Sequence, residues 1–87
     1  MTPVQIKTKV KEAYENVESG DFLQMKVMEA VEQHRQNYRR HKAAHPDQTF
    51  DSWKKQNENV NINSTNNQEI MAMGIFLLAL DEFKPDD

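Results

Sequence analysis

The sequence has 87 residues, enough for one domain whose folding buries roughly 60–65% of the surface of the unfolded chain. It contains no cysteine, which excludes disulfides, thiolate metal sites and cysteine nucleophiles. The net charge of −3 says little about partners by itself. Since Met1-Thr2-Pro3 leads directly into a charged segment, we expect no signal peptide and a cytoplasmic location.

The first segment predicts a helix over residues 3–19. Thr2 and Gln5 have the spacing of a capping box, and proline is favoured at the first helical position. Gly20 is expected to end this helix in a left-handed conformation. The apolar residues that follow helical spacing are Ile6, Val10, Ala13, Tyr14 and Val17.

A longer helix is predicted over residues 22–44, with Asp21 and Gln24 at capping spacing. Its second half has few aliphatic residues, so we expect that half to project from the core or to cover it with aromatic and histidine side chains. Pro46 ends it. One face of this helix consists of Leu23, Val27, Ala30, Val31, His34, Tyr38 and His41.

A short helix follows over residues 50–56, capped by Asp47 or Thr49. Phe50 and Trp53 lie three residues apart, so both rings are predicted to press onto the core. Residues 57–65 are predicted to form a loop, because six of the eleven residues from 57 to 67 are asparagine, which disfavours helix. The alternation of Val60 and Ile62 with asparagines also allows a short extended stretch.

The last helix is predicted over residues 66–83, starting from Ser64 or Thr65, with an acidic tail at residues 84–87. Its apolar run Ile70–Leu80 has 11 residues, whereas a membrane span needs about 20. A helix that is apolar on every side lies in the middle of a bundle or in a homodimer interface. Gly74 is costly in such a helix unless another backbone approaches closely.

These segments together predict an all-α fold, a small helical bundle of three main helices plus one short helix. The bundle forms a single domain over residues 1–87. Four methionines at helical spacing are interpreted as core residues rather than an adaptable binding groove, namely Met25, Met28, Met71 and Met73.

No catalytic pattern stands out, so we expect no enzyme activity and no cofactor. His41 and His45 have the spacing of a zinc pair, but they lack a clear third ligand and a His-Glu-x-x-His motif. We therefore expect no metal site, with His34 at the edge of the core and the other two histidines solvated. The carboxylate pairs Glu12/Glu15 and Glu29/Glu32 lie on polar helix faces and are interpreted as solvated surface.

The charge distribution is the most informative feature. Residues 34–56 carry a net charge of +4, which leaves −7 for the rest of the chain. Arg35, Arg39 and Lys42 form one stripe of the long helix, with aromatic residues between the bases. Arginine and tryptophan dominate protein interfaces, which makes this region the candidate partner-binding site. Its predicted members are Arg35, Tyr38, Arg39, Arg40, Lys42, Trp53, Lys54 and Lys55.

Three functions fit this distribution. The favoured one is a small interaction protein that docks on another protein and self-associates, with a homodimer formed through Ile70–Leu80. The second is a nucleic-acid-binding module in which the basic helix 35–42 binds phosphates while Tyr38 or Trp53 stacks on bases. The acidic balance of the chain, with a pI near 5.6, argues against it. The third is an acidic decoy that uses Asp81–Asp87 to block a DNA-handling protein, and the basic helix argues against that.

Overall fold

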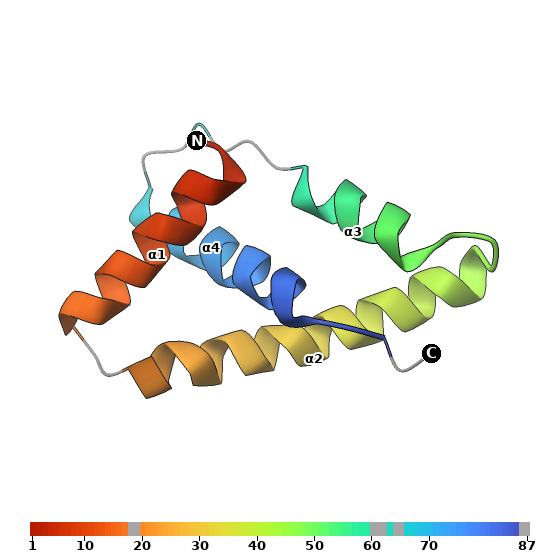
Figure 1. The fold of residues 1–87 in the computed structure, drawn as a ribbon, viewed down its shortest axis with the longest axis horizontal. Coiled ribbons are helices and arrows are strands. Elements are labelled where there is room, and N and C mark those ends of the chain that lie inside the picture. The colour runs from red at the N-terminus through yellow and green to blue at the C-terminus, as the bar shows by residue number, and fades with distance from the viewer. Residues whose placement is uncertain (18–19, 60–62, 64–65, 86–87) are drawn as a thin grey trace.

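The computed structural model describes residues 1–17, 20–59, 63 and 66–85. Over these residues the chain forms four helices and no strand (Figure 1), which confirms the predicted all-α fold of three main helices and one short helix. The helices are α1 (Pro3–Val17), α2 (Gly20–Ala44), α3 (Phe50–Glu58) and α4 (Asn67–Glu82).

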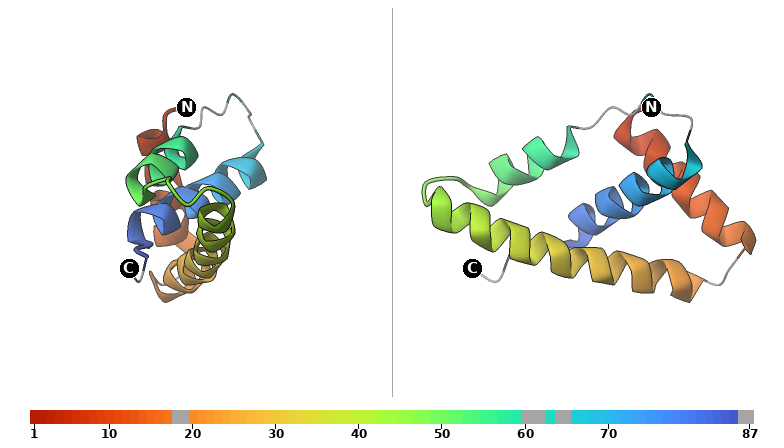
Figure 2. Two further views of the ribbon diagram at one scale, coloured as in Figure 1. Left: turned by 90° about the vertical axis from the view of Figure 1, so that its right-hand side faces the viewer. Right: turned by 180° about the vertical axis from the view of Figure 1, so that it is seen from behind.

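Helix α4 is the central element of the fold. In Figure 1, α1 and α2 form two sides of a triangle, α4 runs between them, and α3 lies along the C-terminal half of α2. The molecule is flat, with principal extents of 42 × 28 × 16 Å (Figure 2). Its radius of gyration is 13.7 Å, against about 12 Å for a compact domain of this length. A flat molecule covers each helix on fewer sides, so the side of α2 turned away from the other helices stays exposed.

The core has two parts, one on each side of α4. Between α1 and α4, Ile6 packs with Ile70 and Leu77. Helix α1 also approaches the backbone of α4 at Gly74, where an added Cβ atom would lie only 1.9 Å from Cγ2 of Val10. This contact meets the expectation that Gly74 serves a close approach. The other part joins α2, α3 and the end of α4 through Val27, Val31, Tyr38, Trp53, Ala79, Leu80 and Phe83.

Helices α1, α3 and α4 begin at capping residues, and of these caps only that of α4 differs from the residues predicted from the sequence. The Thr2 amide donates to Gln5 Oε1 at 2.9 Å, and the Gln5 amide donates to Thr2 Oγ1 at 3.3 Å, which forms the predicted reciprocal pair. Thr49, not Asp47, caps α3 by accepting from the Ser52 amide at 3.1 Å. Asn66 caps α4 by accepting from the Gln68 amide at 2.9 Å. The predicted starts at Ser64 or Thr65 lie outside the described residues.

Two boundaries differ from the prediction. Gly20 begins α2, and no described glycine has a positive φ, so Gly20 does not end α1 in a left-handed conformation. Helix α3 continues to Glu58, which places Asn57 inside it, where its side-chain amide donates to the Trp53 carbonyl at 2.8 Å. Asn59 and Asn63 are exposed and non-helical, while residues 60–62 and 64–65 of the predicted loop lie outside the described part of the chain.

The central position of α4 accounts for its all-round apolar sequence. Its buried residues face α1, α2 and α3, so most of the surface predicted for a homodimer through Ile70–Leu80 is occupied within one chain. Ala72 is the exposed residue of this run. No helix among the described residues is long and apolar enough to cross a bilayer. The buried residues of α4 are Ile70, Gly74, Leu77, Ala79 and Leu80.

Candidate functional site

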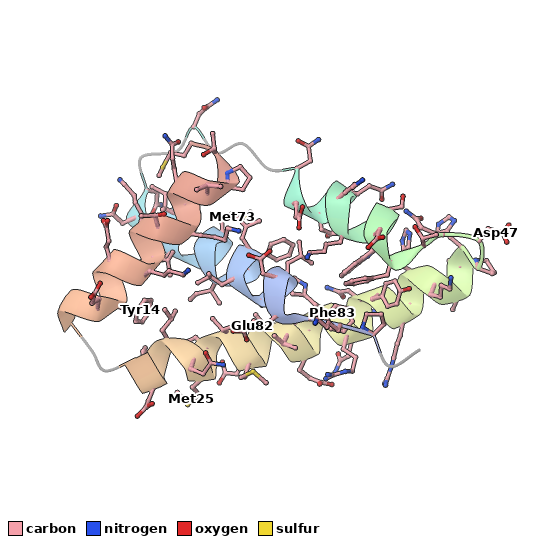
Figure 3. All side chains as sticks on the ribbon, in the orientation of Figure 1. Tyr14, Met25, Asp47, Met73, Glu82 and Phe83 are labelled. Carbon is pink, nitrogen blue, oxygen red and sulfur yellow. The ribbon has the colours of Figure 1, made fainter. Side chains whose placement is uncertain are left out.

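An open groove of about 410 Å³ lies between the C-terminal half of α2 and the segment that follows α4. Figure 3 shows Phe83 beside α2 at this place. We call it the basic groove, because one wall carries three cationic side chains of α2 while Phe83 and Pro85 supply an apolar wall. The groove is lined by Arg35, Tyr38, Arg39, Lys42, Ala43, Phe83 and Pro85.

Phe83 forms part of the apolar wall of the groove. It caps the end of α4 with extended backbone, φ −72° and ψ 131°, and its amide donates to the Ala79 carbonyl at 2.9 Å. This turn sends the ring back into the core, where only 2% of the residue is exposed. Its ring centroid lies 5.6 Å from that of Phe50 and 5.9 Å from that of Trp53. Aromatic residues from α3 and from the end of α4 therefore fix the shape of this wall.

Tyr38 and Trp53 pack in the core. They are 5% and 4% exposed, and their ring centroids lie 5.1 Å apart. Burial leaves no ring face on which a base could stack, and Tyr38 reaches the surface only where it lines the basic groove. The second half of α2 has few aliphatic residues, and these aromatic rings fill the core in their place. The expectation that Trp53 presses onto the core is confirmed.

The three cations of the groove are held differently. The Arg35 guanidinium lies 5.9 Å from the Phe83 ring centroid and forms an ion pair with Glu32. Lys42 Nζ donates to the Gln48 carbonyl at 2.7 Å. Arg39 is exposed and makes no ion pair or side-chain hydrogen bond with another described residue. Arg39 is therefore the cation of this wall with the most freedom to pair with a ligand.

The remaining predicted cations do not line the groove. Arg40 donates to Asn37 Oδ1 at 2.7 Å on another face of α2. On α3, Lys54 Nζ lies 3.7 Å from Glu58 Oε1, and Lys55 is exposed. Of the eight predicted site residues, the groove thus brings together Arg35, Tyr38, Arg39 and Lys42.

The histidines occupy two different environments. His34 is 2% exposed, with Nε2 2.9 Å from the Phe76 carbonyl and its ring edge-to-face with Phe76. It lies deeper than the predicted edge of the core and links α2 to α4. The His41 and His45 ring centroids are 4.8 Å apart, and His41 Nε2 contacts Gln48 Oε1. His41 is half-buried rather than solvated. No described group of three or more histidine or carboxylate side chains is arranged to hold a metal ion.

A second surface lies on the N-terminal half of α2. Met25 and Met28 are each 51% exposed, and Phe22 beside them is also exposed. We call these three residues the methionine face. The interpretation of Met25 and Met28 as core residues is wrong. A helical wheel identifies the exposed position of Met25, because Val27 is buried and residues two apart on a helix point about 200° apart.

Comparison with known protein families, curated proteins and solved structures found no match. The function is therefore inferred from the geometry and chemistry of the basic groove.

Proposed function

We propose that this protein is a non-enzymatic docking protein whose basic groove binds an acidic segment of a protein partner. The observation that carries the proposal is the pairing of a cationic wall with an apolar wall in one groove. Arg35, Arg39 and Lys42 supply the cations, and the half-buried Pro85, backed by the buried Phe83 ring, supplies the apolar surface. A ligand that contacts both walls of the groove must carry carboxylates and an apolar side chain.

The fixed positions of the groove residues favour this role. Arg35 is restrained by Glu32 and by the Phe83 ring, so its side chain loses little freedom when a ligand arrives. Arg39 projects from the second half of the regular helix α2, which holds its backbone in place. Cations of this kind steer an acidic partner and set its register, while the apolar anchor adds affinity.

Nucleic acid is a weaker candidate because the aromatic rings predicted to stack on bases are buried. A phosphate backbone would use the cations and leave the Phe83 and Pro85 surface uncovered. The acidic decoy is also less well supported. Asp81 belongs to the acidic cluster predicted for the decoy. Its Oδ2 lies 2.7 Å from Lys7 Nζ, so part of that cluster is paired within the protein. Asp86 and Asp87 lie outside the described residues.

Fluorescence anisotropy with three labelled probes tests the proposal. The first is an amphipathic peptide with glutamates flanking phenylalanine and methionine anchors. The second is polyglutamate of equal length, and the third is a single-stranded oligonucleotide. We expect the anchored peptide to bind at least about tenfold more tightly than either other probe, because tenfold corresponds to about 1.4 kcal/mol of anchor contact. An oligonucleotide that binds more tightly, with affinity falling steeply as salt rises, would support phosphate recognition instead.

A matched pair of charge reversals locates the binding surface. Arg39→Glu should weaken peptide binding by about tenfold or more, because it places a like charge in the groove. Lys55→Glu makes the same change in net charge on α3, outside the groove, and should leave the affinity within about twofold. Equal losses in both variants would show nonspecific attraction and contradict the proposal. Unchanged far-UV circular dichroism must accompany both.

A further inference from the structure

We infer that a second copy of this chain supplies the acidic segment, through the N-terminal half of its own α2. The inference rests on the proposed function of the basic groove and names its partner. Two copies of α2 would lie antiparallel along their exposed sides, so that each methionine face covers the groove of the other copy.

The exposed side of α2 changes character along its length. Its first half carries Asp21, Glu29 and Glu32 together with the methionine face, all of them exposed. Its second half carries the cations of the basic groove. One helix therefore presents an acidic surface with apolar anchors and, farther along, a basic surface with an apolar wall. These are the two complementary halves of one interface.

Local effects do not account for the whole pattern. The helix dipole favours Asp21 in the first turn and Lys42 in the last turn, but its effect falls off within one turn. Glu29 lies beyond that range and has no ion pair or side-chain hydrogen bond with a described residue. The dipole also gives no reason for two methionines to be half exposed. Burial against a partner explains these exposed methionines, because methionine adapts its shape to an irregular groove.

Antiparallel pairing brings the unlike surfaces together. Glu32 is the middle residue of the 25-residue helix Gly20–Ala44, so a two-fold axis beside it places each half against the opposite half of the other copy. Met25 then lies opposite Arg39, and Glu29 lies opposite Arg35. Asp21 comes beside Lys42 at the end of the groove. Glu32 meets the Glu32 of the other copy at the axis, where each carboxylate is already paired with Arg35 of its own chain. The rest of the interface is self-complementary, and both grooves are filled at once.

The size of α2 sets the expected strength of the dimer. A 25-residue helix is about 37 Å long, and a single helix pair of that length lies at the small end of stable protein interfaces. We therefore expect a reversible dimer with a dissociation constant in the micromolar range. In Figures 1 and 2 no other helix lies along that side of α2, and the segment that follows α4 crosses its second half.

Sedimentation equilibrium on the full chain, from about 1 µM to about 300 µM, tests the pairing. The mean mass should rise with concentration from the 10.2 kDa of one chain toward twice that value. The double variant Arg35→Glu/Lys42→Glu and the double variant Asp21→Arg/Glu29→Arg should each stay monomeric, because each places like charges opposite one another. An equimolar mixture of the two should recover the dimer. The matched control Lys54→Glu/Lys55→Glu should dimerise like the natural protein.

The outcomes separate this inference from the proposed function. A natural chain that stays monomeric at every concentration overturns the inference, as does a mixture that does not associate. So does a dimer that persists in the Asp21→Arg/Glu29→Arg variant, whose substitutions lie on exposed positions away from the core. That same variant keeps its groove and should bind the anchored acidic peptide. If its peptide binding is absent, the proposed function itself fails.

Discussion

Val10 occupies the space that any side chain at Gly74 would need, because a Cβ atom there would lie 1.9 Å from Val10 Cγ2. Gly74→Ala should therefore destabilise the protein by about 1–3 kcal/mol through overpacking, even though alanine gains about 1 kcal/mol in helix propensity. Urea unfolding followed by circular dichroism measures this difference. A stabilised Gly74→Ala variant would contradict the close approach of α1 and α4.

The same contact can be tested by a double-mutant cycle. In a Val10→Ala background, Gly74→Ala should cost less than it does alone, since the Cγ2 atom that it meets is gone. The coupling free energy should be at least about 0.5 kcal/mol. Ala72→Gly, at an exposed position of the same helix, should show only the propensity cost of about 1 kcal/mol and no coupling to Val10.

His34 joins α2 to α4 and should contribute strongly to stability. His34→Ala removes a buried ring and its hydrogen bond to the Phe76 carbonyl, so we expect a loss of about 2–4 kcal/mol. His45→Ala is the control, because His45 is exposed and its loss should cost about 0.5 kcal/mol or less. Urea denaturation of both variants gives the comparison. Equal effects would show that the His34 contacts add nothing to the core.

Phe83 holds the aromatic cluster around Trp53, the single tryptophan of the sequence. Phe83→Ala should cost about 3–5 kcal/mol and should shift Trp53 emission to longer wavelength as water reaches the ring. Phe22→Ala, at an exposed phenylalanine, should cost less than about 1.5 kcal/mol and leave the emission unchanged. An unaltered Trp53 emission spectrum in Phe83→Ala would show that Trp53 stays buried without the Phe83 ring.

The cap of α3 gives a smaller and more local prediction. Thr49→Ala removes the acceptor for the Ser52 amide and should lower the free energy of unfolding by about 1 kcal/mol. Thr49→Ser keeps the hydroxyl and should recover most of that stability. Urea unfolding of the two variants side by side distinguishes capping from general packing, because serine restores the hydrogen bond without the methyl group.

The sequence predicted the helices well because their signals are local. Thr2 and Gln5 form the expected capping pair, and Gly74 marks the expected close approach. The local sequence does not fix a helix boundary where several neighbouring residues can cap the helix. Thr65 and Asn66 both suit that role, and the one that caps is decided by where α4 packs against its neighbours, which the local sequence does not contain.

The sequence predicted the cationic wall of the candidate site but not its apolar wall. Charge spacing along one helix identified Arg35, Arg39 and Lys42, because their shared stripe depends on helix geometry alone. The Phe83 and Pro85 wall comes from a segment distant in sequence, and no local pattern places it against α2. The burial of Tyr38 and Trp53 is not evident from the sequence, because aromatic residues occur in cores and in interfaces and only tertiary packing separates the two positions.

The origin of the groove walls from two distant segments has a thermodynamic consequence. Since Arg39 and Pro85 meet only in the folded chain, any occupant binds the native state and not the unfolded one. By linkage, an occupant at ten times its dissociation constant adds roughly 1.4 kcal/mol to stability, which raises the melting temperature by several degrees in a chain of this size. A thermal-shift screen can therefore identify a ligand for the groove by the heat resistance that it confers.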